Sequence, residues 1–133
     1  MTARSDDRTF CRERAHGRCE YCQLFEYWSP MPHVLDHIQP KQHMGGDDRE
    51  NLAFCCVFCN QQKGPNLAGL DPKTGLLTRL FNPRTAKWGT HLKWAGTVLK
   101  GRTAIGRVIV YIMGINDFER VAMREALVKA GRW

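Results

Sequence analysis

Short apolar blocks alternate with polar, turn-rich segments along the first half of the chain, and each block predicts a short element. Residues 5–16 predict a helix with acidic residues in its first turn. The segments 33–38 and 51–55 have strand character, and the glycine-containing connection between them makes the pair a long-looped hairpin. The composition next predicts a short helix over 56–63, which ends where a glycine and a proline follow.

The second half of the chain first predicts more strands. A strand candidate lies within 75–83. Two four-residue strands, at 91–94 and 97–100, flank a tight turn and predict a small β-hairpin.

Two helices are predicted at the C-terminal end. The apolar residues of 103–113 fall on one helical face, although their β-branched side chains also suit a strand; we favour the helix. A second helix is predicted at 117–130, where Asn116 followed by Glu119 resembles a capping box. This mixture predicts the α+β class, and the chain length suits a single domain over 1–133.

Charge is distributed unevenly along the chain, whose net charge is +7. Residues 1–60 carry seven basic and nine acidic side chains, whereas residues 61–133 carry thirteen and four. A basic region of this kind suits nucleic acid, because it attracts phosphate backbones through counterion release. A solubilising surface is the alternative interpretation.

The sequence predicts no membrane segment. The first ten residues are polar and lack the apolar core of a signal peptide. The longest apolar run, at 108–113, is far shorter than the roughly 20 residues that span a bilayer. We therefore expect a cytoplasmic protein, in which cysteines more often bind metal than form disulfides.

Four of the six cysteines have the spacing of zinc ligands. Cys19 and Cys22 form one CxxC pair, and Cys56 and Cys59 form another. Each pair places two sulfurs on one tight turn, so the two pairs can close a tetrahedral site. Cys55 could replace its neighbour, but the spacing favours Cys56. A four-sulfur site has no open position, so we expect a structural zinc ion.

A carboxylate and an imidazole are adjacent between the two cysteine pairs. Asp36 is a hard oxygen ligand that suits a divalent cation, and His37 can act as a general base near neutral pH. Asn60 directly follows the last zinc cysteine and could supply a second oxygen to that cation. An Asp-His pair is more often part of a turn or a hydrogen bond. Strict strand alternation would also place the two side chains on opposite faces, unless the strand ends there.

These residues together resemble the HNH endonucleases of the ββα-metal class, in the branch whose motif is flanked by two zinc-binding CxxC pairs. The resemblance runs through "CEYC" at 19–22 and "LDHIQPKQHMGGDDRENLAFCCVFCNQQKG" at 35–64. It implies a zinc-held ββα-metal core over 1–66 and a basic C-terminal extension over 67–133, which is similar to the C-terminal part of bacterial HNH proteins.

The resemblance also implies roles for individual residues. Asp36 and Asn60 would hold the catalytic Mg²⁺ or Mn²⁺, His37 would activate water, and Asn51 would secure the hairpin loop and keep His37 oriented. Many family members have histidine at the third signature position, so asparagine at position 60 makes this chain an HNN variant.

Two further residues are candidates for contacts with substrate phosphate. Lys63 lies one helical turn beyond Asn60 and would share its face. His43 lies in the loop just before the paired glycines, where a solvated loop histidine is the alternative interpretation.

The leading hypothesis is a metal-dependent endonuclease that hydrolyses DNA phosphodiesters and leaves 3′-hydroxyl and 5′-phosphate ends. A zinc-stabilised nucleic-acid-binding module without catalysis is the alternative, and RNA is an alternative substrate. A double-strand break made by one active centre would need two copies of the protein or two successive nicks.

Overall fold

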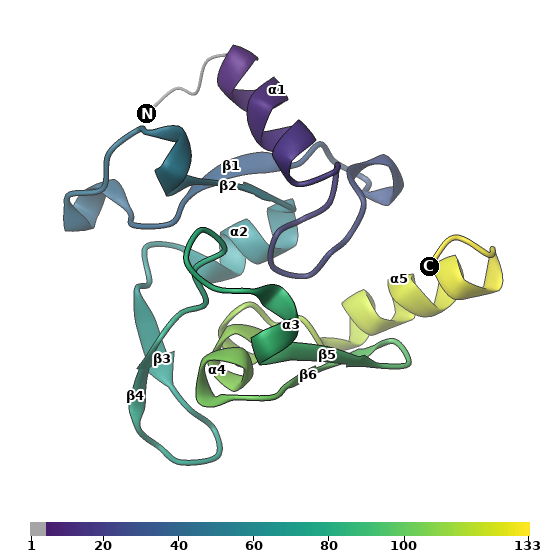
Figure 1. Ribbon diagram of the computed structural model, residues 1–133. Helices are drawn as coiled ribbons and strands as arrows, with labels where there is room; N and C mark the ends of the chain where they lie inside the picture. The colour runs from purple at the N-terminus through teal and green to yellow at the C-terminus, as the bar shows by residue number, and fades with distance from the viewer. Residues whose placement is uncertain (1–4) are drawn as a thin grey trace.

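The computed structural model describes residues 5–133, so residues 1–4 of the predicted domain lie outside this range. The helices and strands, in chain order, are α1 (Ser5–Arg14), β1 (Val34–His37), β2 (Leu52–Cys55), α2 (Val57–Lys63), β3 (Ala68–Leu70), β4 (Leu77–Arg79), α3 (Trp88–His91), β5 (Leu92–Ala95), β6 (Val98–Gly101), α4 (Ala104–Ile112) and α5 (Phe118–Lys129). Figure 1 shows α1 and the β1–β2 hairpin on one side of α2, with the later elements on the other side.

Most of the predicted elements are confirmed. The helix at 5–16, the long-looped hairpin, the helix after it, the small C-terminal hairpin and both C-terminal helices are all present. The sequence pattern did not reveal α3 or β3, which pairs with β4 as a second small hairpin. It also did not reveal three short 3₁₀ turns, at Glu26–Trp28, Lys41–His43 and Arg49–Asn51.

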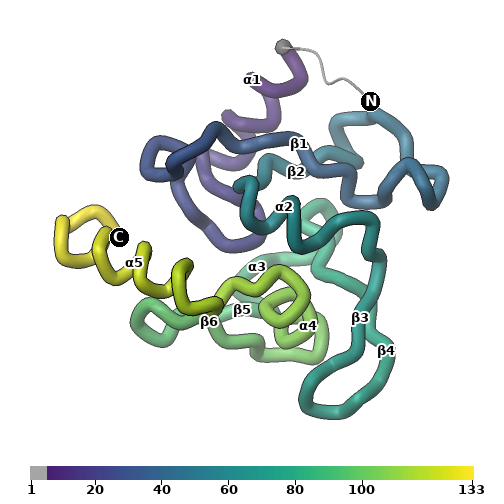
Figure 2. The backbone as a smooth tube through the Cα atoms, turned by 180° about the vertical axis from the view of Figure 1, so that it is seen from behind, coloured from purple at the N-terminus to yellow at the C-terminus, as the bar shows by residue number. Residues whose placement is uncertain are grey.

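The predicted ββα core is formed by β1, β2 and α2. The two strands are antiparallel, with Val34 opposite Cys55 and His37 opposite Leu52. β2 is buried along its whole length, and α2 begins just two residues after it ends. Seen from behind in Figure 2, α2 lies between the hairpin and the C-terminal elements. It contacts β1 on one side, and Arg120 of α5 bonds Cys59 of α2 on the other.

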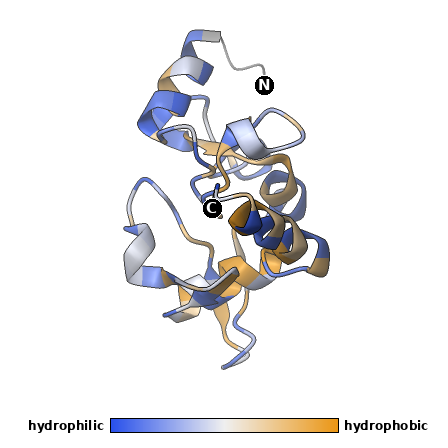
Figure 3. Cartoon of the chain, turned by 90° about the vertical axis from the view of Figure 1, so that its right-hand side faces the viewer, coloured by the Kyte–Doolittle hydropathy of each residue, from blue (hydrophilic) through white to orange (hydrophobic). Residues whose placement is uncertain are grey.

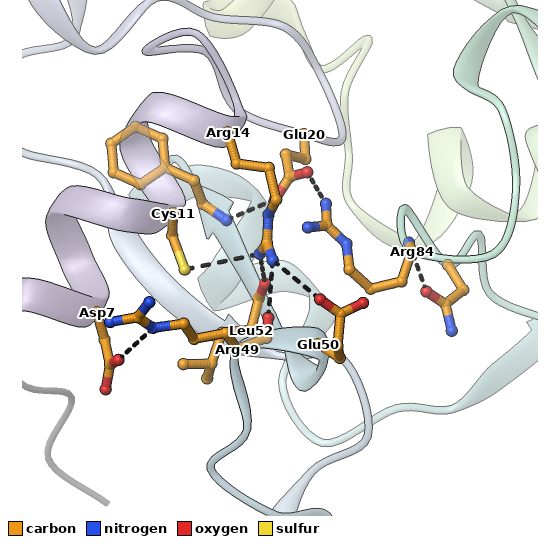
Figure 4. Close-up of polar contacts among 10 residues, drawn as sticks. Asp7, Cys11, Arg14, Glu20, Arg49, Glu50, Leu52 and Arg84 are labelled. Atoms are coloured by element: carbon orange, nitrogen blue, oxygen red, sulfur yellow. Dashed lines mark hydrogen bonds and ion pairs between the residues drawn. The ribbon is translucent and has the colours of Figure 1, made fainter.

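Helix α1 is attached to the hairpin by arginine side chains as well as by apolar contact. Cys11 is fully buried and packs in a small cluster with Leu52. The guanidinium of Arg14 donates to the backbone carbonyls of Arg49, at 3.0 Å, and Leu52, at 2.5 Å, and Arg49 in turn bonds Asp7 (Figure 4). These contacts explain how a helix with mostly hydrophilic residues (Figure 3) is held in place.

Two glycines allow α4 to approach the end of α3 and strand β6 very closely. A Cβ atom at Gly106 would lie 1.9 Å from the carbonyl oxygen of His91, and one at Gly101 would lie 2.2 Å from the backbone nitrogen of Arg107. Any side chain at either position would force the backbones apart. Thr103 caps the helix, because its hydroxyl accepts a hydrogen bond from the Gly106 N–H.

The predicted capping box at the start of α5 is wrong. Asp117, not Asn116, occupies the N-cap position, and it makes no side-chain capping bond. The amide of Asn116 instead bonds both backbone groups of Leu99 on β6, accepting from its N–H at 2.9 Å and donating to its carbonyl at 2.7 Å. A tertiary partner thus replaced the local one that the sequence pattern suggested.

The hydrophobic core joins the two parts of the chain. The four predicted zinc ligands belong to the same buried cluster as aliphatic side chains from the C-terminal hairpin and α4, which are Leu92, Leu99, Val108, Ile109 and Met113. The core therefore continues from the cysteine site into the C-terminal extension.

Asp71 links the β3–β4 connection to α4. Its buried carboxylate accepts hydrogen bonds from the Lys73 N–H, at 3.0 Å, and the Thr74 hydroxyl, at 2.9 Å. It also accepts two bonds from the Arg107 guanidinium, at 2.9 and 2.8 Å. These bonds from Arg107 hold the pKa of Asp71 well below its usual range, so the carboxylate is ionised at neutral pH.

We expect Asp71→Asn to destabilise the protein, because an amide cannot accept the two charge-assisted bonds from Arg107. The melting temperature should fall by about 5 °C or more. The matched control is Glu125→Gln, the same chemical change at an exposed position of α5. Equal melting temperatures for the two variants would contradict a structural role for Asp71.

Candidate metal centre and active site

The structure gathers the four predicted zinc ligands into one buried cluster. The Sγ atoms of Cys19, Cys22, Cys56 and Cys59 all lie within 4.8 Å of one another. Those of Cys22 and Cys56 are 3.6 Å apart, close to the ~3.8 Å between sulfurs on a tetrahedral zinc ion. An all-sulfur donor set with this spacing suits a structural zinc site.

Each CxxC pair forms a tight turn around its first sulfur. The Cys22 N–H points at Cys19 Sγ, at 3.5 Å, and the Cys59 N–H points at Cys56 Sγ, at 3.4 Å. The second of these bonds also caps α2, because Cys56 is its N-cap residue. Cys55, the alternative ligand, is buried on β2 and its thiol donates to the backbone carbonyl of Cys56.

Electrostatics within the cluster favour the thiolate of Cys19, whereas the hydrogen bond with Cys19 raises the pKa of Cys56 and burial raises the pKa of Cys59. Burial raises the pKa of the Cys19 thiol, but hydrogen bonds from neighbouring thiols outweigh burial and bring this pKa well below its ordinary value. Arg120 of α5, itself buried, donates from Nη2 to Cys59 Sγ at 3.0 Å and lies 3.9 Å from Cys56 Sγ. Four thiolates on a divalent ion carry a net charge of −2, so a guanidinium here offsets part of that charge.

Asp36 lies on β1 with its carboxylate turned inward. Its residue is 5% exposed, and Oδ2 accepts a hydrogen bond of 2.8 Å from the hydroxyl of Tyr21. The ammonium of Lys63 lies 3.2 Å from each carboxylate oxygen. Burial raises the pKa of Asp36, although Lys63 and Tyr21 both act to lower it.

Lys63 is buried rather than exposed. It is 1% accessible, and besides the pair with Asp36 its ammonium donates to the backbone carbonyl of His37 at 2.9 Å. Asn60 lies three residues earlier on α2, so it shares the helix face that Lys63 turns toward β1. The structure thus brings Asp36 and Lys63 into contact, one helical turn from Asn60.

His37 is the last residue of β1, and its ring has a different partner. Nε2 lies 3.0 Å from Oδ1 of Asp47, which is half exposed and also lies 3.6 Å from the ammonium of Lys41. The hydrogen bond with His37 lowers the pKa of Asp47. The strand ends at His37. Strict alternation therefore does not extend beyond this residue, and the side chains of Asp36 and His37 can serve one site.

The loop between the strands is fastened by Asn51. Its side-chain oxygen accepts from the Gln39 N–H at 2.9 Å, and its amide nitrogen donates to the carbonyls of Gln39, at 3.0 Å, and Gly46, at 2.8 Å. Gly45 makes this closure possible, because a Cβ atom there would lie 1.7 Å from the Gln39 carbonyl oxygen. The fastened loop carries His43, which is exposed.

Comparison with known proteins agrees with this geometry. A family model described as HNH endonuclease matches residues 19–66, which contain both cysteine pairs and the ββα unit. We refer to residues 19–66 as the HNH segment, after the family that they resemble. The chain is also similar to the Septu protein PtuB of Bacillus thuringiensis, with 23% identity over 118 residues. The similar stretch covers 87% of this chain but 43% of that relative, and no solved structure matches.

Three residues at the HNH site were missed by the sequence analysis. Tyr21 lies between two zinc ligands and yet reaches Asp36, Asp47 contacts His37, and Arg120 contacts the thiols. Tyr21 and Asp47 lie inside the two segments that carry the resemblance, and both have polar side chains that can bond a site residue. No sequence signal connects Arg120 with Cys59, which lies 61 residues away.

Within residues 5–133, no helix is long and apolar enough to cross a membrane.

We expect Arg120→Met to weaken zinc retention by the HNH segment, because the thiolates lose their buried cationic partner. The rate of zinc release to a chromogenic chelator should rise by about tenfold or more. Lys129→Met removes the same charge from an exposed position of the same helix and should leave this rate unchanged. Equal release rates from both variants would show that Arg120 does not support the metal.

Proposed function

We propose that the protein is a metal-dependent endonuclease that hydrolyses DNA phosphodiester bonds and leaves 3′-hydroxyl and 5′-phosphate ends. The single observation that carries this proposal is an HNH family match over a ββα unit in which His37, with an acidic partner, ends the strand that carries the buried Asp36. RNA is the alternative substrate.

The oxygens of Asp36 and Asn60 fit the catalytic metal. Carboxylate and amide oxygens are the hard donors that Mg²⁺ and Mn²⁺ prefer. Asp36 lies on β1, and Asn60 lies on α2 one helical turn before Lys63, whose ammonium contacts Asp36. The bound metal would stabilise the negative charge that develops on the phosphate and on the leaving 3′ oxygen.

His37 is the proposed general base. With Nε2 held by Asp47, Nδ1 is the ring nitrogen that accepts the proton of the attacking water. Asp47 orients the imidazole and stabilises its protonated form, as carboxylates beside catalytic histidines do. Asn51 closes the loop that carries Asp47 and thereby keeps this pair in place.

We expect His37→Ala to reduce nicking of supercoiled plasmid, in Mg²⁺ or Mn²⁺, by about 10²-fold or more, because the base is lost. His16→Asn is the control: it removes another imidazole at a positive-φ position that asparagine tolerates, and it should cut at the wild-type rate.

A His37→Ala protein that cuts as fast as wild type would overturn the assignment of the base. Binding without cutting by the wild-type protein would instead favour the zinc-stabilised binding module. The same assay with a labelled RNA separates the two substrates.

The β5–β6 hairpin is the proposed contact for the nucleic-acid backbone. Lys93 and Lys100 are directly opposite each other and both are exposed. Among residues 5–133, neither forms an ion pair. Like charges directly opposite across a hairpin destabilise it, so a bound polyanion would relieve this repulsion. His43 on the exposed loop is the proposed second phosphate contact.

We expect the double variant Lys93→Gln, Lys100→Gln to bind duplex DNA more weakly. The slope of log affinity against log salt is negative and is measured by fluorescence anisotropy without divalent metal. Its magnitude should become smaller by about 2, because two phosphate contacts are lost. Lys129→Gln on α5 is the control. An unchanged slope in the double variant would exclude the hairpin from the interface.

A further inference from the structure

A buried ammonium occupies the surroundings of the carboxylate that we assign to the catalytic metal. Nζ of Lys63 is 3.2 Å from both oxygens of Asp36, and the two side chains are 2% and 5% exposed. The same ammonium donates to the carbonyl of His37 at 2.9 Å. The Lys63 ammonium is therefore held by three oxygens: both carboxylate oxygens of Asp36, the proposed metal ligand, and the backbone carbonyl oxygen of His37.

These contacts offset part of the cost of burying the charge of Asp36. A buried carboxylate is costly unless it is paired and hydrogen-bonded, and here Lys63 supplies the charge while Tyr21 supplies a further donor. The arrangement also places a positive charge beside the oxygens that a divalent cation would need.

A divalent cation bound to Asp36 would lie close to this ammonium and be repelled by it. Both charges are attracted to the same two oxygens, and the low accessibility of the site limits screening by water. Metal binding must therefore either displace Lys63 from Asp36 or tolerate the repulsion. In both cases the ammonium lowers the affinity of the site for metal.

We propose that Lys63 competes with the divalent metal for the Asp36 carboxylate and so keeps metal affinity weak. The inference rests on the proposed function, because it takes Asp36 as a metal ligand. Lys63 then has a role different from a permanent phosphate contact: it is the resident counterion of the site. Its flexible four-carbon side chain allows it to leave Asp36 when the metal enters.

The test is a Mn²⁺ titration of the full, zinc-loaded chain without nucleic acid, with free Mn²⁺ followed by electron paramagnetic resonance. Lys63→Met should bind Mn²⁺ about tenfold or more tightly than wild type, which is the size of effect that a charge at this distance exerts. Asp36→Asn should abolish the site. Lys41→Met removes a nearby exposed charge and should change the affinity much less.

A second variant protects the test against misfolding. Lys63→Met leaves a buried carboxylate with less compensation, so its fold is checked by thermal melting and zinc content. Lys63→Gln removes the charge but keeps an amide donor for Asp36 and the His37 carbonyl, and it should also bind Mn²⁺ more tightly. If only this variant folds, its affinity decides the question.

The outcomes separate this inference from the proposed function. If wild type binds Mn²⁺ through Asp36 and a folded Lys63 variant binds it equally or more weakly, competition is overturned while the metal site stands. If neither wild type nor a folded Lys63 variant binds Mn²⁺ at Asp36, the metal-dependent function itself fails. A site that appears only after Lys63 is replaced would support competition in its strongest form.

Discussion

The convergence of four buried thiols is the constraint on which the rest of the structure depends. It joins the turn at Cys19 and Cys22 to the start of α2, and so fixes that helix beneath the β1–β2 hairpin. The catalytic candidates follow from this junction. Asn60 comes one residue after the last thiol, and Tyr21, between two thiols, reaches the carboxylate of Asp36. Metal binding at such a site contributes on the order of 10 kcal/mol to folding, so the geometry of the candidate active site is tied to the cysteine cluster.

Buried charges connect the HNH segment to the C-terminal extension. Arg120 of α5 contacts the thiols, and the guanidinium of Arg84 pairs with Glu20 inside the first cysteine turn. Trp88 adds a hydrogen bond to the backbone carbonyl of Tyr21. Because removing one partner of a buried pair leaves an uncompensated charge, these contacts make the extension part of the support of the site. Its basic character is therefore divided between an inner set of cations that hold the fold and an outer set available to a polyanion.

Local sequence patterns predicted the elements whose signals are themselves local. The strand character of 33–38 and 51–55, the glycine and proline after Lys63, and the apolar face of α4 each act within a few residues, and these elements are confirmed. Prediction failed where a distant partner was available. The capping box predicted at Asn116 does not form, because the Asn116 amide bonds the backbone of Leu99, which lies 17 residues earlier in the chain. The three-residue strand β3 and the single turn of α3 are too short to produce a periodic signal.

The sequence by itself determined which chemistry the site can hold: four sulfur ligands at fixed spacing, a carboxylate beside an imidazole, and an amide after the last thiol. Spacing and residue type are local properties, so they can be read along the chain. Only the tertiary structure decided the partners of these groups. Lys63 meets Asp36 across 27 positions, and Arg120 meets Cys59 across 61. Such contacts exist only after the hairpin, α2 and α5 have packed together, because burial removes water and makes each charge depend on its neighbours.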